Sequence, residues 1–174
     1  HGIEDMALAC SLPGFTVICP SDSLETAQVV RAAADDDGPV YIRLARAATP
    51  VVHNDNYVFT PNRSEILRQG NDLTIIATGV MVSVSLDAAY LLAQSGIQAR
   101  VVNMHTWRPT DEATILTAAR ETGAVVTAEE HYIHGGLGSI VAQVLGQGQP
   151  VPLEIVALQG YAESGKAEEL MAKS

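Results

Sequence analysis

The sequence predicts an α/β protein whose parallel sheets are covered by helices on both faces. Short apolar segments rich in β-branched residues alternate with segments in which apolar residues recur at helical spacing. The short segments are largely apolar on both faces, as in strands buried between layers of helices. We therefore expect strands at residues 15–19, 39–44, 73–78, 99–104, 124–129 and 153–158.

Stripes of apolar side chains predict the helices between these strands. The stripes are Leu24, Ala27, Val30 and Ala34; Val84, Ala88, Leu91 and Leu92; Ile115, Ala118 and Ala119; and Ile140, Val141, Val144 and Leu145. Ser21 or Ser23 is suited to cap the first helix, and Gly96 and Gly123 to end the second and third. A further helix is expected to open at HGIED, residues 1–5.

The alternation fails at residues 45–72, which contain turn residues and polar residues without a sustained period. We interpret residues 49–72 as a linker between a first unit at 1–48 and a second unit at 73–174. The first unit has about two strands and two helices, which bury little surface by themselves. We therefore expect it to complete a domain that begins outside this chain, in keeping with a first residue, His1, that is not Met.

Composition narrows the class of protein. Of the 174 residues, 47% are hydrophobic and 17% charged, which is typical of a folded chain. A formal net charge of -10 argues against nucleic acid or an anionic membrane as the main partner. No apolar segment is long enough to span a bilayer, so a soluble cytoplasmic protein is expected. Cys10 and Cys19 lie among apolar neighbours, as reduced buried thiols usually do.

Two arginines, Arg43 and Arg46, flank the end of the segment YIRLAR. Basic groups at the carboxyl end of a parallel strand commonly face the ligand crevice. Arg46 is the better candidate, because a guanidinium there can bind a phosphate through two parallel hydrogen bonds; a salt bridge with a carboxylate is the alternative. His1 would lie at the start of the first helix, where anions bind, or be a terminal residue without a role.

The segment EEHYIHGGLGS, residues 129–139, places His131 and His134 three residues apart beside Glu130, as in some metal sites. The glycines follow at once, so we place the segment on a strand-to-helix loop and predict no metal site. These glycines match neither the dinucleotide nor the Walker pattern and predict close helix-to-sheet packing. His105 lies just past a strand, where ligands bind, but a structural histidine is favoured.

No serine, cysteine or carboxylate pair has the surroundings of a catalytic group. From the residues alone we therefore predict no catalytic, cofactor-binding or metal-binding residue in this chain.

Six segments together resemble the C-terminal part of transketolases. They are HGIEDMALACSLPGFTVICPSD, DGPVYIRLAR, LTIIATGVMVS, ARVVNMHTWRPTD, ETGAVVTAEEHYIHGGLGS and GYAESG. They have the family's order and spacing and cover nearly the whole chain. The chain is especially similar to the tail of the second subunit in bacterial and archaeal transketolases that are split into two subunits.

The resemblance implies an activity and a layout. Transketolases move two-carbon ketol units between sugar phosphates with thiamine diphosphate and Mg²⁺, as in the pentose phosphate pathway. Residues 1–48 would end the pyrimidine-binding domain, which has a thiamine-diphosphate-binding fold. After the linker, residues 73–174 would form the C-terminal domain, a three-layer sheet with helices on both faces.

The family's cofactor-activating glutamate and GDG metal motif do not occur in this chain. The resemblance therefore implies that the chain alone binds no cofactor and requires an N-terminal subunit or region, in a homodimer or heterotetramer. Arg46 matches the family's substrate phosphate-binding arginine. His1 matches less directly, because many members read THHGIED, in which the phosphate-binding histidine would precede His1.

Two alternatives remain. The tails of 2-oxo acid dehydrogenase beta subunits and of deoxyxylulose-phosphate synthase share the GGLGS-like turn, although HGIED and VNMHTWRP favour transketolase. The chain taken by itself could also be a non-catalytic module that dimerises or binds a partner, although a domain boundary at His1 would be unusual.

Overall fold

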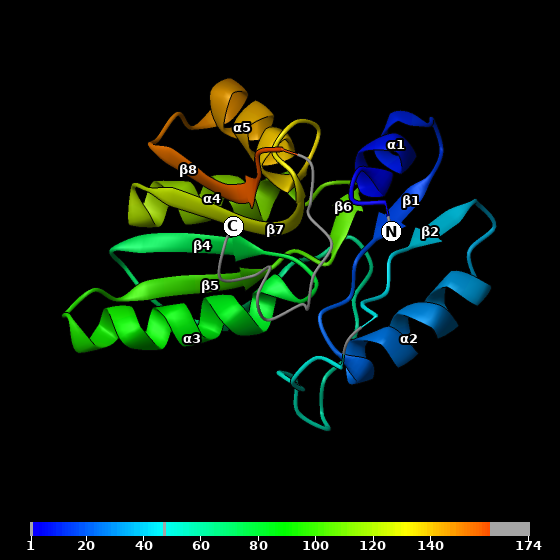
Figure 1. Cartoon of the computed structure of the whole chain (residues 1–174), viewed down its shortest axis with the longest axis horizontal. Coiled ribbons are helices and arrows are strands. Elements are labelled where there is room, and N and C mark those ends of the chain that lie inside the picture. The colour runs from blue at the N-terminus through cyan, green and yellow to red at the C-terminus, as the bar shows by residue number, and fades with distance from the viewer. Residues whose placement is uncertain (1, 47, 161–174) are drawn as a thin grey trace.

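The computed structural model describes residues 2–46 and 48–160, which form five helices and eight strands (Figure 1). In chain order they are α1 (Asp5–Ser11), β1 (Thr16–Ile18), α2 (Ser23–Ala34), β2 (Val40–Ile42), β3 (Glu65–Arg68), β4 (Leu73–Ala77), α3 (Met81–Gln94), β5 (Ala99–Asn103), β6 (Thr106–Arg108), α4 (Glu112–Thr122), β7 (Val125–Tyr132), α5 (Leu137–Gly148) and β8 (Leu153–Leu158).

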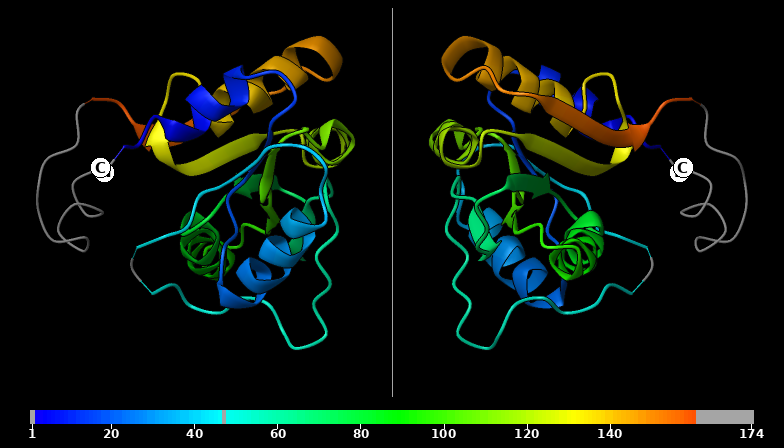
Figure 2. Two further views of the ribbon diagram at one scale, coloured as in Figure 1. Left: turned by 90° about the vertical axis from the view of Figure 1, so that its right-hand side faces the viewer. Right: turned by 90° about the vertical axis from the view of Figure 1, so that its left-hand side faces the viewer.

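These strands form two sheets. The five-stranded sheet has the order β3-β5-β4-β7-β8 and is parallel except for β3. Helix α3 covers one of its faces, and α4 and α5 cover the other, as the views in Figures 1 and 2 show. The smaller sheet has the order β2-β1-β6, in which β1 is parallel to β2 and antiparallel to β6. The predicted α/β class with helices on both faces is confirmed.

All six predicted strands are present, as β1, β2, β4, β5, β7 and β8. Two strands were not predicted: β3, which lies inside the expected linker, and β6, which follows His105. Both have only three or four residues, too few to show a period. Strand β6 belongs to the second unit but pairs with β1 of the first, so the two units share a sheet.

The predicted ends of α4 are confirmed, whereas the predicted cap of α2 is wrong. Asp111 caps α4 and Gly123 ends it in the left-handed conformation at φ 72°. At α2, however, the cap is Asp22 rather than Ser21 or Ser23, because the Asp22 carboxylate accepts a hydrogen bond from the backbone N–H of Glu25 at 2.9 Å. Ser21 binds the Glu25 side chain instead.

The predicted inward faces of α2 and α3 were wrong. In α2 the buried side chains are Glu25 and Val29, whereas Val30 is 48% exposed. The inward face was missed because its first residue is a carboxylate. In α3 the buried side chains are Met81, Val82, Ser85 and Ala89, whereas Val84 and Leu91 lie outward. Helix α3 is apolar almost all round, so sequence spacing does not identify one face.

The core joins both units. Met6 of α1, Trp107 of β6, Ile76 of β4 and Leu137 of α5 belong to one cluster of buried side chains. Cys19 is buried against it and Cys10 is half-buried, and both are free thiols whose pKa burial raises to about 11. Among the helices of the described residues, none has the length and apolar character that crossing a bilayer requires.

Candidate functional site

The carboxyl end of β2 carries the two arginines predicted from the sequence. Arg43 directly follows β2, and its backbone N–H donates to the carbonyl of Ile18 at 2.9 Å, which continues the β1–β2 pairing. Arg46 follows three residues later and is exposed. The structure therefore places both side chains at the expected edge of the sheet, with Arg46 the more exposed.

Arg43 is engaged within the protein. Its Nη1 donates to the backbone carbonyl of Glu130 at 2.7 Å, and Nη2 lies 3.9 Å from the Glu130 carboxylate. Its Nε lies 3.7 Å from Oδ2 of Asp5, which also accepts a hydrogen bond from the Tyr41 hydroxyl at 2.7 Å. The pKa of Tyr41 is raised to about 12, mainly because its hydroxyl donates to Asp5. Arg43 thus holds α1, β2 and the end of β7 together.

His1 lies outside the described residues, so its predicted role in phosphate binding stays a prediction. The expected helix at HGIED begins later than predicted, at Asp5 with Glu4 as its N-cap residue. Glu4 provides no side-chain cap; its carboxylate instead accepts the backbone N–H of Ile3 at 2.8 Å. Residues 2–4 therefore form a short non-helical segment before α1.

The segment EEHYIHGGLGS begins inside β7, which continues to Tyr132, so the predicted loop is shorter than expected. Glu129 is 3% exposed, and its carboxylate accepts the backbone N–H groups of Leu137 at 2.6 Å and Gly138 at 2.8 Å, at the start of α5. Burial raises the pKa of Glu129 to about 7, against the lowering effect of these two donors. Glu129 is a helix-capping residue supplied by the neighbouring strand.

The glycines of this segment have the packing role that the sequence predicted. A Cβ at Gly138 would lie 2.6 Å from Cγ2 of Ile155 and 2.9 Å from Oγ1 of Thr127, so only glycine lets α5 approach the sheet this closely. A Cβ at Gly136 would collide with the Glu129 carboxylate.

Both ring nitrogens of His131 have partners within the protein. Nδ1 donates to the carbonyl of Tyr132 at 2.7 Å, and Nε2 accepts the backbone N–H of Ala7 at 3.3 Å. The ring also packs edge-on against Trp107. His131 therefore attaches α1 to β7, while His134 is exposed. Within the described ranges, no group of three or more His, Cys, Asp or Glu side chains is arranged to hold a metal ion.

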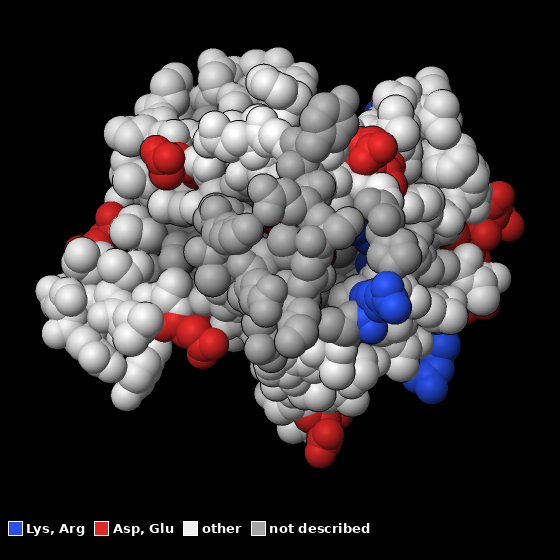
Figure 3. Space-filling model, in the orientation of Figure 1, with Lys and Arg blue, Asp and Glu red and all other residues white. Residues whose placement is uncertain are grey.

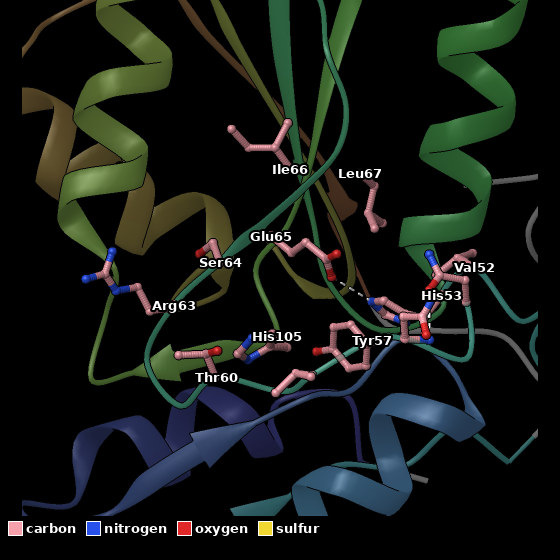
Figure 4. Close-up of a pocket in the computed structure, with 13 residues that line it drawn as sticks. Val52, His53, Tyr57, Thr60, Arg63, Ser64, Glu65, Ile66, Leu67 and His105 are labelled. Atoms are coloured by element: carbon pink, nitrogen blue, oxygen red, sulfur yellow. Dashed lines mark hydrogen bonds and ion pairs between the residues drawn. The ribbon is translucent and has the colours of Figure 1, made fainter.

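A second polar region lies beside the predicted linker, where a groove of about 750 Å³ runs along β3 (Figure 4). His53, Tyr57 and Glu65 line it, with His105 at its base. The ring of His53 is buried, with Nε2 3.0 Å from Oε2 of Glu65 and Nδ1 2.8 Å from Oδ2 of Asp22. Burial raises the pKa of Glu65, although His53 opposes this shift. The predicted linker is thus attached to both units.

Two fully buried carboxylates at the start of α2 organise this attachment. Asp22 accepts hydrogen bonds from the backbone N–H groups of Val52 and His53 in addition to the His53 ring. Glu25 accepts the hydroxyl of Tyr57 at 2.7 Å and the side-chain amide of Asn103 at 2.9 Å. The first unit, the linker and β5 therefore meet in one buried polar network.

His105 has the structural role that the sequence favoured. It is 1% exposed, its Nδ1 lies 2.7 Å from the Thr106 hydroxyl, and its ring packs against Phe59. Its carbonyl accepts the backbone N–H of Cys19 at 2.7 Å, and burial lowers the pKa of its imidazole.

Sequence reasoning did not identify two sets of contacts: those of Arg43 with Asp5 and Glu130, and those of Asp22 with His53. These residues are far apart in sequence, and a carboxylate in a helical first turn is normally explained by the helix dipole. On the face shown in Figure 3, the basic side chains lie on the right-hand half, where β2 and α2 lie in Figure 1, while acidic side chains are scattered.

Two family models match the chain. Residues 1–51 match the family described as transketolase, pyrimidine binding domain, and residues 62–174 match transketolase, C-terminal domain.

Curated relatives and one solved structure are similar over almost the whole chain. A 6-deoxy-6-sulfo-D-fructose transketolase subunit from Clostridium sp. is 43% identical over 98% of this chain and 53% of its own length. An apulose-4-phosphate transketolase subunit from Phocaeicola vulgatus is 40% identical over 91% of this chain and 51% of its own length. A structure described as a split gene transketolase, inactive beta4 tetramer, has 43% identity and a TM-score of 0.97 over 99% of this chain and 57% of its own. This chain therefore spans about half the length of these relatives.

Proposed function

The chain belongs to the transketolase family, and we propose that it is part of an enzyme that transfers two-carbon ketol units between ketose and aldose phosphates. The observation that carries this proposal is the succession of the two transketolase domains in one chain that is 43% identical to a split gene transketolase. Thiamine diphosphate and Mg²⁺ would serve the assembled enzyme.

The hollow beside Arg43 does not by itself fit this cofactor. The hollow at the carboxyl end of β2 is lined by Cys19, Arg43, Thr78 and Glu130 and has a volume of about 20 Å³. Thiamine diphosphate would require a pocket of several hundred Å³. We propose that parts outside this chain bind the cofactor, and we derive no chemical step through it.

Arg46 would bind the phosphate of the sugar substrate. It is exposed at the carboxyl end of a parallel strand, the position where ligands bind in such sheets. A guanidinium binds phosphate through a planar pair of charge-assisted hydrogen bonds, and binding at a remote group orients the reacting carbons. The relatives support an anionic substrate, because their names contain a sulfonated sugar and a sugar phosphate. His1 would assist Arg46 from the segment that precedes α1.

We further propose that residues 1–48 complete the pyrimidine-binding domain, that residues 49–72 link the domains and that residues 73–174 form the C-terminal domain. The matches at 1–51 and 62–174 support this division. Strand β2 forms an edge of the smaller sheet, and its side chains are only half-buried. Another strand of the complete domain would pair there.

The partner would be an N-terminal transketolase subunit or region in the cytoplasm, within a homodimer or heterotetramer. A relative that forms a β4 tetramer is described as inactive, which supports a requirement for a companion. The alternative of a non-catalytic module is less well supported, because both domain matches are to an enzyme family.

The Arg46→Gln variant tests the role of Arg46 in the enzyme assembled with its companion subunit, thiamine diphosphate and Mg²⁺. Loss of a charged hydrogen-bond pair is worth about 1.5–3 kcal/mol, so KM for phosphorylated acceptors should rise roughly 10- to 150-fold. Unphosphorylated sugars should react at an unchanged rate. Arg31→Gln, an exposed arginine on the last turn of α2, is the matched control. Equal losses for both classes of sugar would contradict this role.

A further inference from the structure

Arg43 lies where three segments from different parts of the fold meet. Its guanidinium, 17% exposed, reaches across from β2 to the Glu130 carbonyl at 2.7 Å and to the Asp5 carboxylate at 3.7 Å. Glu130 belongs to the five-stranded sheet and Asp5 to the start of α1. Because this guanidinium is largely withdrawn from water, its charged contacts are stronger than those of an exposed ion pair.

The surrounding contacts make this meeting point rigid. The Tyr41 hydroxyl fixes Asp5 Oδ2 from the strand that also carries Arg43. The backbone N–H of Tyr132 donates to the carbonyl of Ile3 at 3.3 Å, which attaches the segment before α1 to the end of β7. A Cβ at Gly135 would lie 2.9 Å from Cβ of Ala7, so α1 approaches this loop closely. The partners of Arg43 are therefore themselves held in place.

Arg43 also has a backbone anchor three residues before Arg46. Its own N–H continues the β1–β2 ladder, whereas the next side chain, Leu44, is 55% exposed, and Ala45 and Arg46 are exposed too. The chain between Arg43 and Arg46 is only two residues long. This link is too short to absorb a shift of the Arg43 backbone, so such a shift also moves Arg46.

We infer that Arg43 is a positioning residue that couples the C-terminal domain to the phosphate site, by fixing the end of β2 against Glu130 of β7. This inference rests on the proposed function of Arg46. Through Arg43, the C-terminal domain would contribute to substrate binding, although side chains of that domain need not contact the substrate. A displacement of the C-terminal domain would be expressed as weaker binding of phosphorylated sugars.

The effects of the Arg43 and Arg46 replacements on KM should be non-additive if Arg43 positions Arg46, and additive if Arg43 only stabilises the fold. If Arg43 acts through Arg46, its replacement should matter only while Arg46 is present. Arg43→Gln should raise KM for a phosphorylated acceptor about tenfold with little change in kcat. This is less than the roughly 100-fold that a misplacement of about an ångström can cost, because the Arg43 backbone stays bonded to Ile18. In the Arg46→Gln background, the same change should alter KM less than about twofold.

Matched variants complete the experiment, which uses the enzyme assembled with its companion subunit. Arg43→Lys keeps the charge near Asp5 and should restore part of the loss. Arg108→Gln removes a chemically similar contact, from an arginine to the backbone carbonyl of Cys10 on α1, but lies away from the end of β2 and should leave KM unchanged. The role of Arg43 is overturned if its replacement affects phosphorylated and free sugars equally, or if its effect adds fully to that of Arg46→Gln.

A second readout does not depend on catalysis. Backbone amide exchange at Leu44 and Arg46 should be faster in Arg43→Gln than in wild type or Arg108→Gln, because the anchor before these residues is lost. Unchanged exchange would overturn the positioning role even if the enzyme is active. Faster exchange in Arg43→Gln, together with no ketol transfer by the wild-type enzyme, would support the anchoring by Arg43 and overturn the proposed function instead.

Discussion

Replacement of Asp22 should destabilise the protein more than any ordinary helix-cap substitution. Its side chain is fully buried and accepts four hydrogen bonds, one from the Glu25 N–H that begins α2 and three from the linker residues Val52 and His53. Asparagine has nearly the same shape but only one acceptor oxygen. An Asp22→Asn variant therefore cannot satisfy both the helix and the linker.

The expected magnitude follows from these contacts. Loss of an N-cap costs about 1 kcal/mol, and each buried donor left without an acceptor costs about 1–3 kcal/mol, partly relieved where the linker moves toward water. We expect Asp22→Asn to lower the free energy of unfolding by about 3 kcal/mol and Asp22→Ala by about 4 kcal/mol. These losses are large beside the 5–15 kcal/mol that is typical of a whole domain.

Urea unfolding, followed by the fluorescence of the buried single tryptophan Trp107, measures this change. Asp111→Asn is the matched control, because Asp111 caps α4 and accepts one linker N–H, from Ser64 at 2.8 Å, but has no histidine partner. It should lose about half as much as Asp22→Asn. A loss below about 1 kcal/mol for Asp22→Asn, or equal losses for the two variants, would refute the reasoning.

The free energy of unfolding should also depend on pH through the Asp22 carboxylate. Burial opposes ionisation of Asp22, but its backbone and His53 hydrogen bonds outweigh burial, so the pKa of Asp22 lies below its usual value. The stabilisation of the folded state by ionised Asp22 is therefore present above the unfolded pKa of about 4. It is lost as the pH falls through the lower folded pKa. Asp22→Asn should lack this loss in acid.

Two further stability predictions concern the start and end of α5. Gly138→Ala should destabilise by about 1–3 kcal/mol because its Cβ would press on Ile155, whereas Gly146→Ala in the same helix, which meets nothing within 4 Å, should stabilise by about 0.5–1 kcal/mol. Equal effects in urea unfolding would contradict the close packing. Because burial raises the pKa of Glu129 from 4.5 to about 7, the folded state retains a proton that the unfolded state loses, and Glu129 should lower stability by up to about 3 kcal/mol as the pH rises through this range. Glu129→Gln should remove that slope, and an unchanged slope would contradict it.

The sequence predicted the structure best where the spacing of apolar residues fits only one kind of element. The buried parallel strands such as β4 and β5 are largely apolar, and α4 has a polar cap, an apolar stripe and a terminal glycine that agree. Helix α3 shows the limit, since Val84 and Leu91 look as suited to the core as Val82 and Ala89. Only the position of the sheet beneath α3 decides which face is buried.

The candidate site was predicted only in part. Arg46 was predicted from strand order and from the family resemblance, and its role in phosphate binding stays a prediction. The role of Arg43 cannot, because Asp5 and Glu130 become its neighbours only after three separate segments are packed. The network around Asp22 and His53 was missed for a similar reason, since polar residues in a linker are normally expected in solvent.

Ketol transfer by the reconstituted enzyme tests the central claim most directly. The protein, its companion subunit, and their mixture would each be assayed with thiamine diphosphate, Mg²⁺, a ketose phosphate donor and an aldose phosphate acceptor. The proposed function predicts transfer by the mixture and none by either component alone. Transfer by this chain alone would contradict the assignment of the cofactor site to a companion, and no transfer by a mixture that forms a stable complex, with any sugar phosphate pair, would contradict the proposed activity.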